Sequence, residues 1–213
     1  MEENRLKTGT TTVGIQCKDG VVLAADRRAT AGYLIANKKA EKVFPLNERI
    51  AVTISGMVSD AQLLTKLMKA ELKLKEMRAD REVTVKEAAN LLAGLIYGNV
   101  RRPSMIPGIS HFLLGGTDFS GFHLYDLFAD GSITEIDDFV ASGSGSVIAY
   151  GVLETLYKKD LSIADGVDLA IKSVNAAMQR DIASGQGIDV VSITKDGVKK
   201  VFEQQIDYSI KVK

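Results

Sequence analysis

The sequence predicts an α+β domain in which two β-sheets pack face to face and helices cover the outside. Strand-like and helix-like segments come in blocks: strands, two helices, strands, two helices, strands. The first strands are almost continuously apolar, as expected of strands that are covered on both faces. The chain has 213 residues, of which 46% are hydrophobic and 25% are charged, so it can bury the core of one sizeable domain.

The first strand block begins near the N-terminus. Residues 11–17 form a run rich in β-branched side chains, in which alternate residues face opposite sides. The Lys-Asp-Gly sequence at 18–20 is a hairpin signal, and the apolar residues 21–26 complete the hairpin. A further pair of strands is predicted at 42–44 and 50–55.

Two amphipathic helices are predicted next. The core-facing side of the first is predicted from apolar residues at steps of three and four, namely Leu63, Leu67, Ala70, Leu74 and Met77. The second helix opens at a capping box formed by Thr84 and Glu87. Its predicted inner face consists of Ala88, Leu91, Leu92, Leu95 and Ile96.

The second half of the chain repeats this order of elements. Residues 111–140 form a second strand block, and two more helices follow at 147–157 and 162–180. A hairpin of 188–194 and 198–202 closes the chain. No linker or internal repeat divides the sequence, so we expect one domain.

Composition argues against several classes of function. The chain has 27 Lys and Arg against 27 Asp and Glu, so no net charge favours binding to nucleic acid or to an anionic membrane. No apolar run approaches the length of a membrane span, and the charged residues 1–9 lack the apolar centre of a secretory signal. The single cysteine, Cys17, suits a reducing compartment. We therefore expect a cytoplasmic protein.

The Gly9-Thr10 bond is the most informative functional signal. A threonine hydroxyl inside a chain is a poor nucleophile, but cleavage of this bond would give Thr10 a free α-amino group that can act as its base. The alternative is a disordered tail followed by an ordinary strand. Because strand residues alternate, Thr11 faces the same side as Val13 and Ile15 while Thr10 faces the other side, which makes Thr11 the least suitable nucleophile.

Other chemistries fit the sequence less well. His111 and His123 lie in predicted strands without metal-ligand spacing, and no motif supplies the partners of a Ser-His-Asp hydrolase. The Ser-Gly-Ser-Gly-Ser segment at 142–146 could cradle a phosphate, but a tight turn explains it at least as well. Cys17 faces the apolar side of its strand and is expected to be buried and inert. We expect no metal and no cofactor.

A catalytic threonine makes further demands on the chain. It needs a cation that keeps its amine neutral, a carboxylate that holds this cation, and an N–H group that receives an oxyanion. Asp26 ends the second predicted strand, Lys42 opens the third, and Gly56 follows the fourth just before a helix. The alternative for these residues is a surface charge cluster and a turn.

Six blocks of sequence, in order, carry a close resemblance to a known family. They are residues 9–14 (GTTTVG), 25–30 (ADRRAT), 41–44 (EKVF), 55–56 (SG), 141–146 (ASGSGS) and 180–185 (RDIASG). The chain resembles a proteasome β subunit of the archaeal type, from Gly9 essentially to the C-terminus. The resemblance implies the four-layer αββα sandwich of the N-terminal-nucleophile hydrolases and the activity of a threonine endopeptidase.

The resemblance also implies a role for each site residue. Thr10 would be the nucleophile, and Lys42, paired with Asp26, would keep the Thr10 amine neutral or help to move the hydroxyl proton. Which of the two groups takes that proton stays open. The Gly56 N–H would stabilise the oxyanion. Hydrogen-bonded support around the Thr10 amine would come from Ser144, Asp181 and Ser184.

Self-processing and substrate preference follow from the same resemblance. Thr10 would attack the Gly9 carbonyl, so that residues 1–9 are removed as a propeptide and residues 10–213 remain as the catalytic domain. The substrate side chain before the cut bond would enter an apolar pocket, which favours cleavage after hydrophobic residues. The pocket residues, for which core packing is the alternative, are Ala29, Thr30, Ala40, Phe44, Ile54 and Val58.

The implied partners are α subunits in flanking rings, other β subunits in stacked heptameric rings, an ATPase regulator acting through the α ring, and unfolded protein substrates. One alternative is a non-catalytic ring subunit, which the presence of Thr10, Asp26, Lys42 and Gly56 together disfavours. Another is a small-molecule amidase or nucleotide-binding domain built on the glycine-rich turn, which the strand-first order of elements disfavours.

Overall fold

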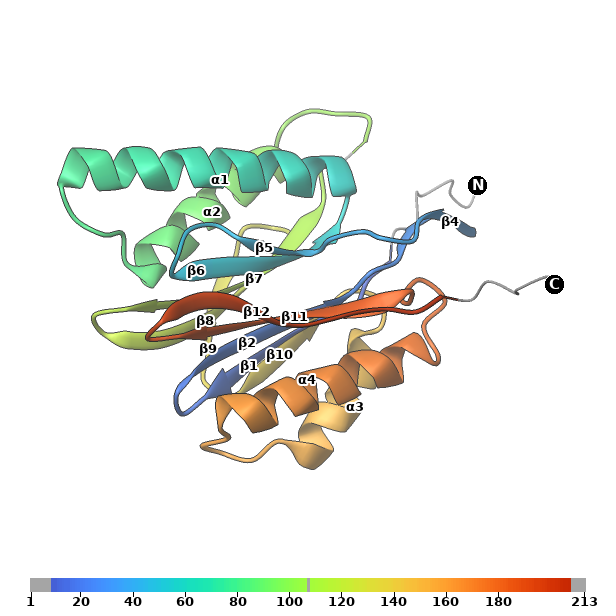
Figure 1. Cartoon of the computed structure of the whole chain (residues 1–213). Coiled ribbons are helices and arrows are strands. Elements are labelled where there is room, and N and C mark those ends of the chain that lie inside the picture. The colour runs from blue at the N-terminus through green and yellow to red at the C-terminus, as the bar shows by residue number, and fades with distance from the viewer. Residues whose placement is uncertain (1–8, 107, 208–213) are drawn as a thin grey trace.

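The computed structural model describes residues 9–106 and 108–207, which form four layers. In Figure 1, the helices α1 and α2 lie above one sheet and the helices α3 and α4 lie below the other. The two sheets are therefore enclosed between two helix pairs. This arrangement confirms the expected αββα sandwich and the expected order of strand and helix blocks.

The first sheet is antiparallel and has the strand order β10-β1-β2-β11-β12. Its strands are β1 (Thr12–Cys17), β2 (Gly20–Asp26), β10 (Phe139–Ser142), β11 (Gly187–Thr194) and β12 (Gly197–Gln205). Within this sheet, Thr12 lies opposite Ala25 on one side and Ser142 on the other. The start of β1 is thus flanked by the ends of β2 and β10.

The second sheet is also antiparallel and has the order β5-β6-β7-β8-β9. Its strands are β5 (Val43–Pro45), β6 (Ile50–Gly56), β7 (Ser110–Asp118), β8 (Gly121–Leu127) and β9 (Ile133–Ile136). A separate hairpin consists of β3 (Ala29–Ala31) and β4 (Leu34–Asn37). The sequence did not predict this hairpin, because its strands are short and half or fully exposed and so carry no apolar pattern.

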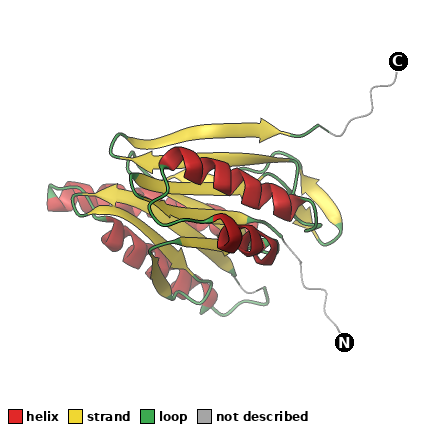
Figure 2. Cartoon of the chain, turned by 90° about the horizontal axis from the view of Figure 1, so that it is seen from below, coloured by secondary structure: helices red, strands yellow, loops and turns green. Residues whose placement is uncertain are grey.

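The helices cover the two outer faces in pairs. The second sheet packs against α1 (Val58–Ala79) and α2 (Val85–Val100), and the first packs against α3 (Ser146–Leu156) and α4 (Ile163–Met178). Figure 2, seen from below, shows one pair of helices lying over the face of its sheet. Among the described residues, no helix combines the length and apolar character needed to cross a membrane.

Apolar side chains fill three separate interfaces between the layers. One cluster, which includes Val52 and Leu92, lies between the second sheet and its helices, and another, which includes Val13 and Val174, lies between the first sheet and its helices. A third, which includes Leu23 and Leu113, lies between the two sheets. Strands that are covered on both faces explain the continuous apolar runs in the sequence.

The predicted core-facing side of α1 is wrong. Its buried residues are Ala61, Leu64, Thr65, Met68 and Leu72. The predicted residues lie on the other side of the helix, where the side chains of the four large ones are 41–69% exposed and Ala70 is also exposed. Both sets recur at helical spacing, so the sequence pattern alone does not indicate which of them meets the sheet.

Most other local predictions are confirmed. The capping box at the start of α2 is present, since Thr84 accepts from the Glu87 N–H at 3.2 Å and Glu87 accepts from the Thr84 N–H at 3.0 Å. On α2, Ala88, Leu92 and Ile96 are buried as predicted, while the other two predicted residues are half-buried. Cys17 is buried, and burial, with the nearby carboxylates, raises the pKa of its thiol to about 12.

Candidate active site

Strand ends from both sheets contribute the expected site residues. The first sheet contributes the start of β1, the end of β2 at Asp26 and the end of β10. The second contributes Lys42, whose carbonyl accepts from the Ile54 N–H at 2.9 Å, and Gly56, the last residue of β6. The side chains of Thr10, Asp26 and Lys42 are all buried. The site is therefore a buried junction between the sheets.

Asp26 is fully buried, and both of its carboxylate oxygens accept hydrogen bonds. One oxygen accepts from Lys42 Nζ at 2.7 Å and from the Thr11 N–H at 3.0 Å. The other accepts from the N–H groups of Arg28 and Gly185, each at 2.9 Å. Four donors compensate for the loss of water around this charge and hold the carboxylate in one orientation.

Lys42 is a buried cation with one carboxylate partner. Burial lowers the pKa of Lys42 below that of an exposed lysine, while the charge and hydrogen bond of Asp26 act in the opposite direction. A lysine with a lowered pKa releases and accepts a proton more readily near neutral pH. Lys42 is therefore a buried cation held by Asp26 and not part of a surface charge cluster.

A hydrogen-bonded network surrounds the main chain of Thr10. The Thr10 N–H donates to Ser144 Oγ at 3.2 Å, and Ser144 donates to Asp181 Oδ2 at 2.7 Å. Ser184 donates to the same carboxylate oxygen at 2.6 Å, and its hydroxyl lies 2.7 Å from that of Thr11. The structure thus brings together Ser144, Asp181 and Ser184 beside the Thr10 N–H. The Thr11 hydroxyl belongs to this supporting network.

The Gly9-Thr10 peptide is tightly enclosed. The Thr10 hydroxyl donates to the Gly9 carbonyl oxygen at 2.7 Å. A Cβ at Gly9 would overlap the Cβ of Ala183 and lie 2.7 Å from Ser144 Oγ. Glycine is therefore the residue that fits immediately before Thr10, and the Thr10 hydroxyl already contacts the carbonyl group of that residue.

The glycine-rich segment after β10 packs against the start of β1. Gly143 has φ +91°, and a Cβ there would overlap the Thr10 carbonyl, while a Cβ at Gly145 would overlap Thr11 Oγ1. The Gly145 N–H donates to the Thr10 carbonyl at 3.3 Å. These glycines allow two segments of the main chain, residues 143–145 and the start of β1, to approach closely. Their role is therefore explained by packing against Thr10 and Thr11 and does not require a bound phosphate.

Gly56 ends β6 with a left-handed main chain. Its φ is +100°, a main-chain conformation that favours glycine, and a Cβ there would overlap the Ile109 carbonyl. Any larger residue would therefore strain the main chain and clash with Ile109. Helix α1 begins two residues later at Val58. The partial positive charge at the start of a helix favours a developing negative charge nearby.

The expected pocket residues lie in different environments. Ala29 and Thr30 are half-buried in β3, and Ala40 is half-buried with its N–H donating to the Arg27 carbonyl at 3.0 Å. Ile54 is buried in the cluster between the second sheet and its helices, and Phe44 packs against that cluster. Val58 is half-exposed at the start of α1.

The sequence did not identify every residue that shapes the site. Arg28 donates to Gln186 Oε1 at 2.5 Å and to the Ile182 carbonyl at 2.7 Å, and a Cβ at Gly185 would overlap its guanidinium. Arg28 therefore ties the loop that contains Asp181 and Ser184 to the end of β2. These contacts join residues far apart in the sequence, and no local pattern indicates them.

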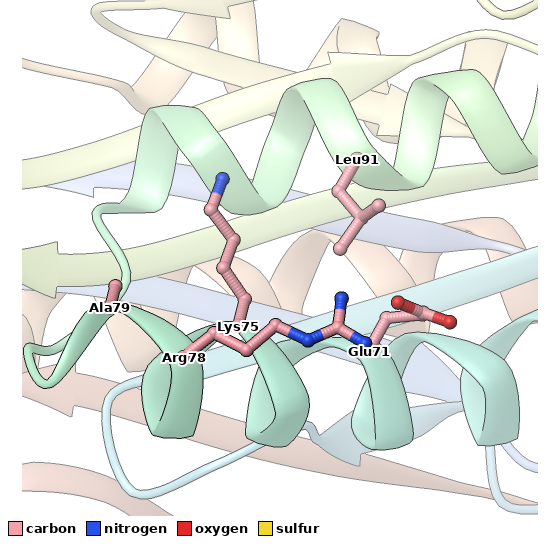
Figure 3. A pocket seen from close by; sticks show the side chains of 5 residues that line it. All are labelled: Glu71, Lys75, Arg78, Ala79 and Leu91. Carbon is pink, nitrogen blue, oxygen red and sulfur yellow. The ribbon is translucent and has the colours of Figure 1, made fainter.

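A hollow of about 280 Å³ lies elsewhere, between α1 and α2. It is lined by Glu71, Lys75, Arg78, Ala79 and Leu91, which Figure 3 shows together, and it contains none of the expected site residues. Within residues 9–106 and 108–207, no group of three or more His, Cys, Asp or Glu side chains is arranged to hold a metal ion.

Comparisons with known proteins identify the family of the chain. The family model described as proteasome subunit matches residues 6–193. The chain belongs to the proteasome subunit family. It is 44% identical to the proteasome subunit beta of Archaeoglobus profundus, over 96% of this chain and 94% of that protein. The corresponding protein of Ferroglobus placidus is 44% identical over 97% of both chains.

A third relative gives the same result. The proteasome subunit beta of Methanothermobacter thermautotrophicus is 44% identical over 98% of this chain and 97% of its own length. The resemblance to archaeal-type proteasome β subunits is thus confirmed over nearly the whole chain. With it, the expected class of enzyme, a threonine-type endopeptidase of the proteasome, is confirmed at the level of the family.

Proposed function

We propose that this proteasome subunit is a threonine endopeptidase in which Thr10 is the nucleophile, released by self-cleavage of the Gly9-Thr10 bond. One observation carries the proposal. The Thr10 hydroxyl donates a hydrogen bond to the Gly9 carbonyl oxygen. Both groups belong to a buried site that also contains the Lys42–Asp26 ion pair. The site thus contains the hydroxyl, a cation that can exchange protons and the bond to be cut.

Self-cleavage begins with attack of Thr10 Oγ1 on the Gly9 carbonyl carbon. A C–O bond forms, the C–N bond of the peptide breaks, and the hydroxyl proton ends on the nitrogen of Thr10. Water then hydrolyses the Gly9 ester, which leaves a carboxyl group on Gly9 and restores the Thr10 hydroxyl. The α-amine does not exist before this reaction, so Lys42 or a water molecule takes the first proton.

Peptide hydrolysis then repeats the same chemistry on a substrate. Thr10 attacks the substrate carbonyl, with its new α-amine or Lys42 accepting the hydroxyl proton, and the leaving amine receives a proton as the acyl-enzyme forms. The Gly56 N–H stabilises the oxyanion of each tetrahedral intermediate. Ser144, Asp181 and Ser184 hold the amine in place, and water hydrolyses the acyl-enzyme.

The N-terminus of the mature protein tests the proposal directly. Intact mass and N-terminal sequencing of peptidase-active particles should place Thr10 first, because Gly9 is cut from it before turnover. The processing time course of freshly made protein should show loss of residues 1–9 in one step. Active particles that retain Met1 would be incompatible with a Thr10 α-amine.

The tight fit of Gly9 supplies a matched pair of variants for this experiment. Gly9→Ala places a methyl group against Ala183, displaces the scissile carbonyl and should slow self-cleavage by a factor on the order of 10². Combining it with Ala183→Gly removes the overlapping Cβ and should restore most of the rate. Equal rates for Gly9→Ala and the parent would show that the observed enclosure has no bearing on cleavage.

We also propose that substrates are cut after hydrophobic residues. The expected pocket residues Ala29, Ala40, Phe44 and Val58 are all apolar and uncharged, and burying a charged substrate side chain against them would be costly. Peptides with Phe or Leu before the cut bond should give kcat/KM values at least about tenfold above those with Arg or Asp. Val58→Asp, at the exposed first turn of α1, should raise cleavage after Arg relative to Phe. A preference for charged residues in the parent would overturn this assignment.

The wider setting of the proposal follows the family. We propose that residues 1–9 are the propeptide and 10–213 the catalytic domain, and that the subunit works in stacked heptameric β rings flanked by α rings. There it would degrade unfolded proteins to short peptides, with an ATPase regulator acting through the α ring, in the cytoplasm. A non-catalytic subunit is disfavoured because Asp26 and Lys42 are buried and paired beside Thr10.

A further inference from the structure

A second hydrogen-bonded chain connects the two sheets next to the site. Nε2 of His111 is hydrogen-bonded to Asp126, and Nδ1 of the same ring lies 2.8 Å from Ser142 Oγ. The Ser142 hydroxyl in turn lies 3.0 Å from that of Ser55. None of these four residues has a part in the mechanism proposed above.

The chain crosses from one sheet to the other. Ser55, His111 and Asp126 lie on the adjacent strands β6, β7 and β8 of the second sheet, and Ser55 is directly opposite His111 in the β6–β7 register. Ser142 is the last residue of β10 in the first sheet. The contact between the two serine hydroxyls is therefore a polar link between the two sheets, in addition to the apolar cluster that they share.

Each serine directly precedes, in the sequence, a glycine of the proposed site. Ser55 precedes Gly56, the oxyanion donor, and Ser142 precedes Gly143, which packs on the Thr10 carbonyl. The serine–serine contact thus joins the strand end that presents the oxyanion donor to the turn that supports the nucleophile. A shift of one end relative to the other would change the distance between the Gly56 N–H and the carbonyl under attack.

A Ser-His-Asp hydrolase built from the same residues does not fit this geometry. Ser142 is the last residue of β10, and its buried hydroxyl faces the second sheet. That hydroxyl is already engaged by both His111 and Ser55. The arrangement is suited to holding two strand ends together and not to nucleophilic attack.

We propose that Asp126, His111, Ser142 and Ser55 form a positioning chain that sets the Gly56 N–H relative to Thr10. The inference rests on the proposed function and adds positioning residues to it. In this chain the His111 Nε2–H donates to Asp126, and Nδ1 accepts from the Ser142 hydroxyl. Ser142 then accepts from the Ser55 hydroxyl, so every link has one donor and one acceptor.

Two substitutions at His111 separate the two ends of the ring. The Asn side chain can place an amide oxygen near the Nδ1 position, facing Ser142, whereas Gln reaches the Nε2 position, facing Asp126. His111→Gln and Ser142→Ala should lower kcat for peptide hydrolysis by about tenfold, with KM within about twofold, because the Gly56 N–H meets only the developing oxyanion. His111→Asn should keep kcat within about threefold of the parent.

The other histidine of the chain supplies a matched control. His123 also lies between a carboxylate and a serine, with Glu135 at 2.9 Å and Ser120 at 2.9 Å, but both of these partners are exposed, and neither is next to Gly56 or Gly143 in the sequence. His123→Gln should leave kcat and KM unchanged. Thermal melting and the N-terminal mass of each variant establish that it is folded and processed.

The outcomes distinguish this inference from the proposed function. If His111→Gln and Ser142→Ala match the parent in kcat, or if only their KM changes, the positioning chain is refuted while an inactive Thr10→Ala leaves the proposed function standing. If Thr10→Ala remains active and loses that activity on addition of Ser142→Ala, Ser142 is a nucleophile and both proposals fail. A kcat loss in His111→Asn equal to that in His111→Gln also contradicts the chain.

Discussion

Replacing Thr10 by Ala should abolish peptide hydrolysis and leave residues 1–9 attached. The variant lacks the only hydroxyl that contacts the Gly9 carbonyl in the described part of the chain, so neither self-cleavage nor substrate attack has a nucleophile. We expect kcat to fall by a factor on the order of 10³ or more. Folding should be retained, because the Thr10 main chain still donates to Ser144. Intact mass and a fluorogenic peptide assay on the same preparation measure both effects.

Two other threonine variants serve as controls for this experiment. Thr10→Ser keeps a hydroxyl at the same position and should retain self-cleavage and part of the peptidase activity. Thr12→Val replaces a buried hydroxyl that has no hydrogen-bond partner among the described residues, so it should behave like the parent. Substantial hydrolysis by purified Thr10→Ala, free of parent protein, would point to another nucleophile.

Replacing Lys42 by Ala should have the second largest effect. Lys42 is buried, burial lowers its pKa, and its ammonium group is held 2.7 Å from Asp26, so its loss removes the proton-exchanging cation of the site. We expect kcat and the rate of self-cleavage each to fall by a factor on the order of 10² to 10⁴. Rates at several pH values, for processing and for peptide hydrolysis, measure this effect.

The Lys42 experiment needs a control for stability. Lys42→Ala leaves the Asp26 carboxylate buried without its cation, which is destabilising in itself. Lys42→Arg keeps a positive charge opposite Asp26 but stays protonated at working pH, so it should fold and still be strongly impaired. Thermal melting separates the two causes. A folded Lys42→Arg variant with parental kcat would assign Lys42 an electrostatic role without proton transfer.

Much of the fold was predictable because each element carries a local signal. Strands covered on both faces appear as apolar runs, hairpins are marked by Lys-Asp-Gly at 18–20 and 195–197, and α2 opens at a capping box. The core-facing side of α1 was not predictable, since one apolar stripe follows Leu64 and Met68 while a second follows Leu63 and Leu67. Only the position of the sheet decides between them.

The sequence indicated the main residues of the candidate site but not the contacts that surround them. Thr10, Asp26 and Lys42 were identified from their order along the chain and from a family resemblance, and the structure places the Asp26–Lys42 ion pair beside the start of β1. The contact between Asp126 and His111 depends on the register of β7 with β8, and its continuation to Ser142 depends on how the sheets stack. Register and stacking are properties of the folded chain that no short segment encodes.

The hydrogen bonds of Asp26 also have a consequence for how the site forms. This single carboxylate is oriented by Thr11 at the start of the chain, by its neighbour Arg28, by Lys42 and by Gly185 near the end. Asp26 and Gly185 are 159 residues apart in the sequence, so all four donors reach this carboxylate only after distant segments of the domain have folded together. The proposed site, and with it any activity, therefore depends on folding of the domain as a whole and not on any one hairpin.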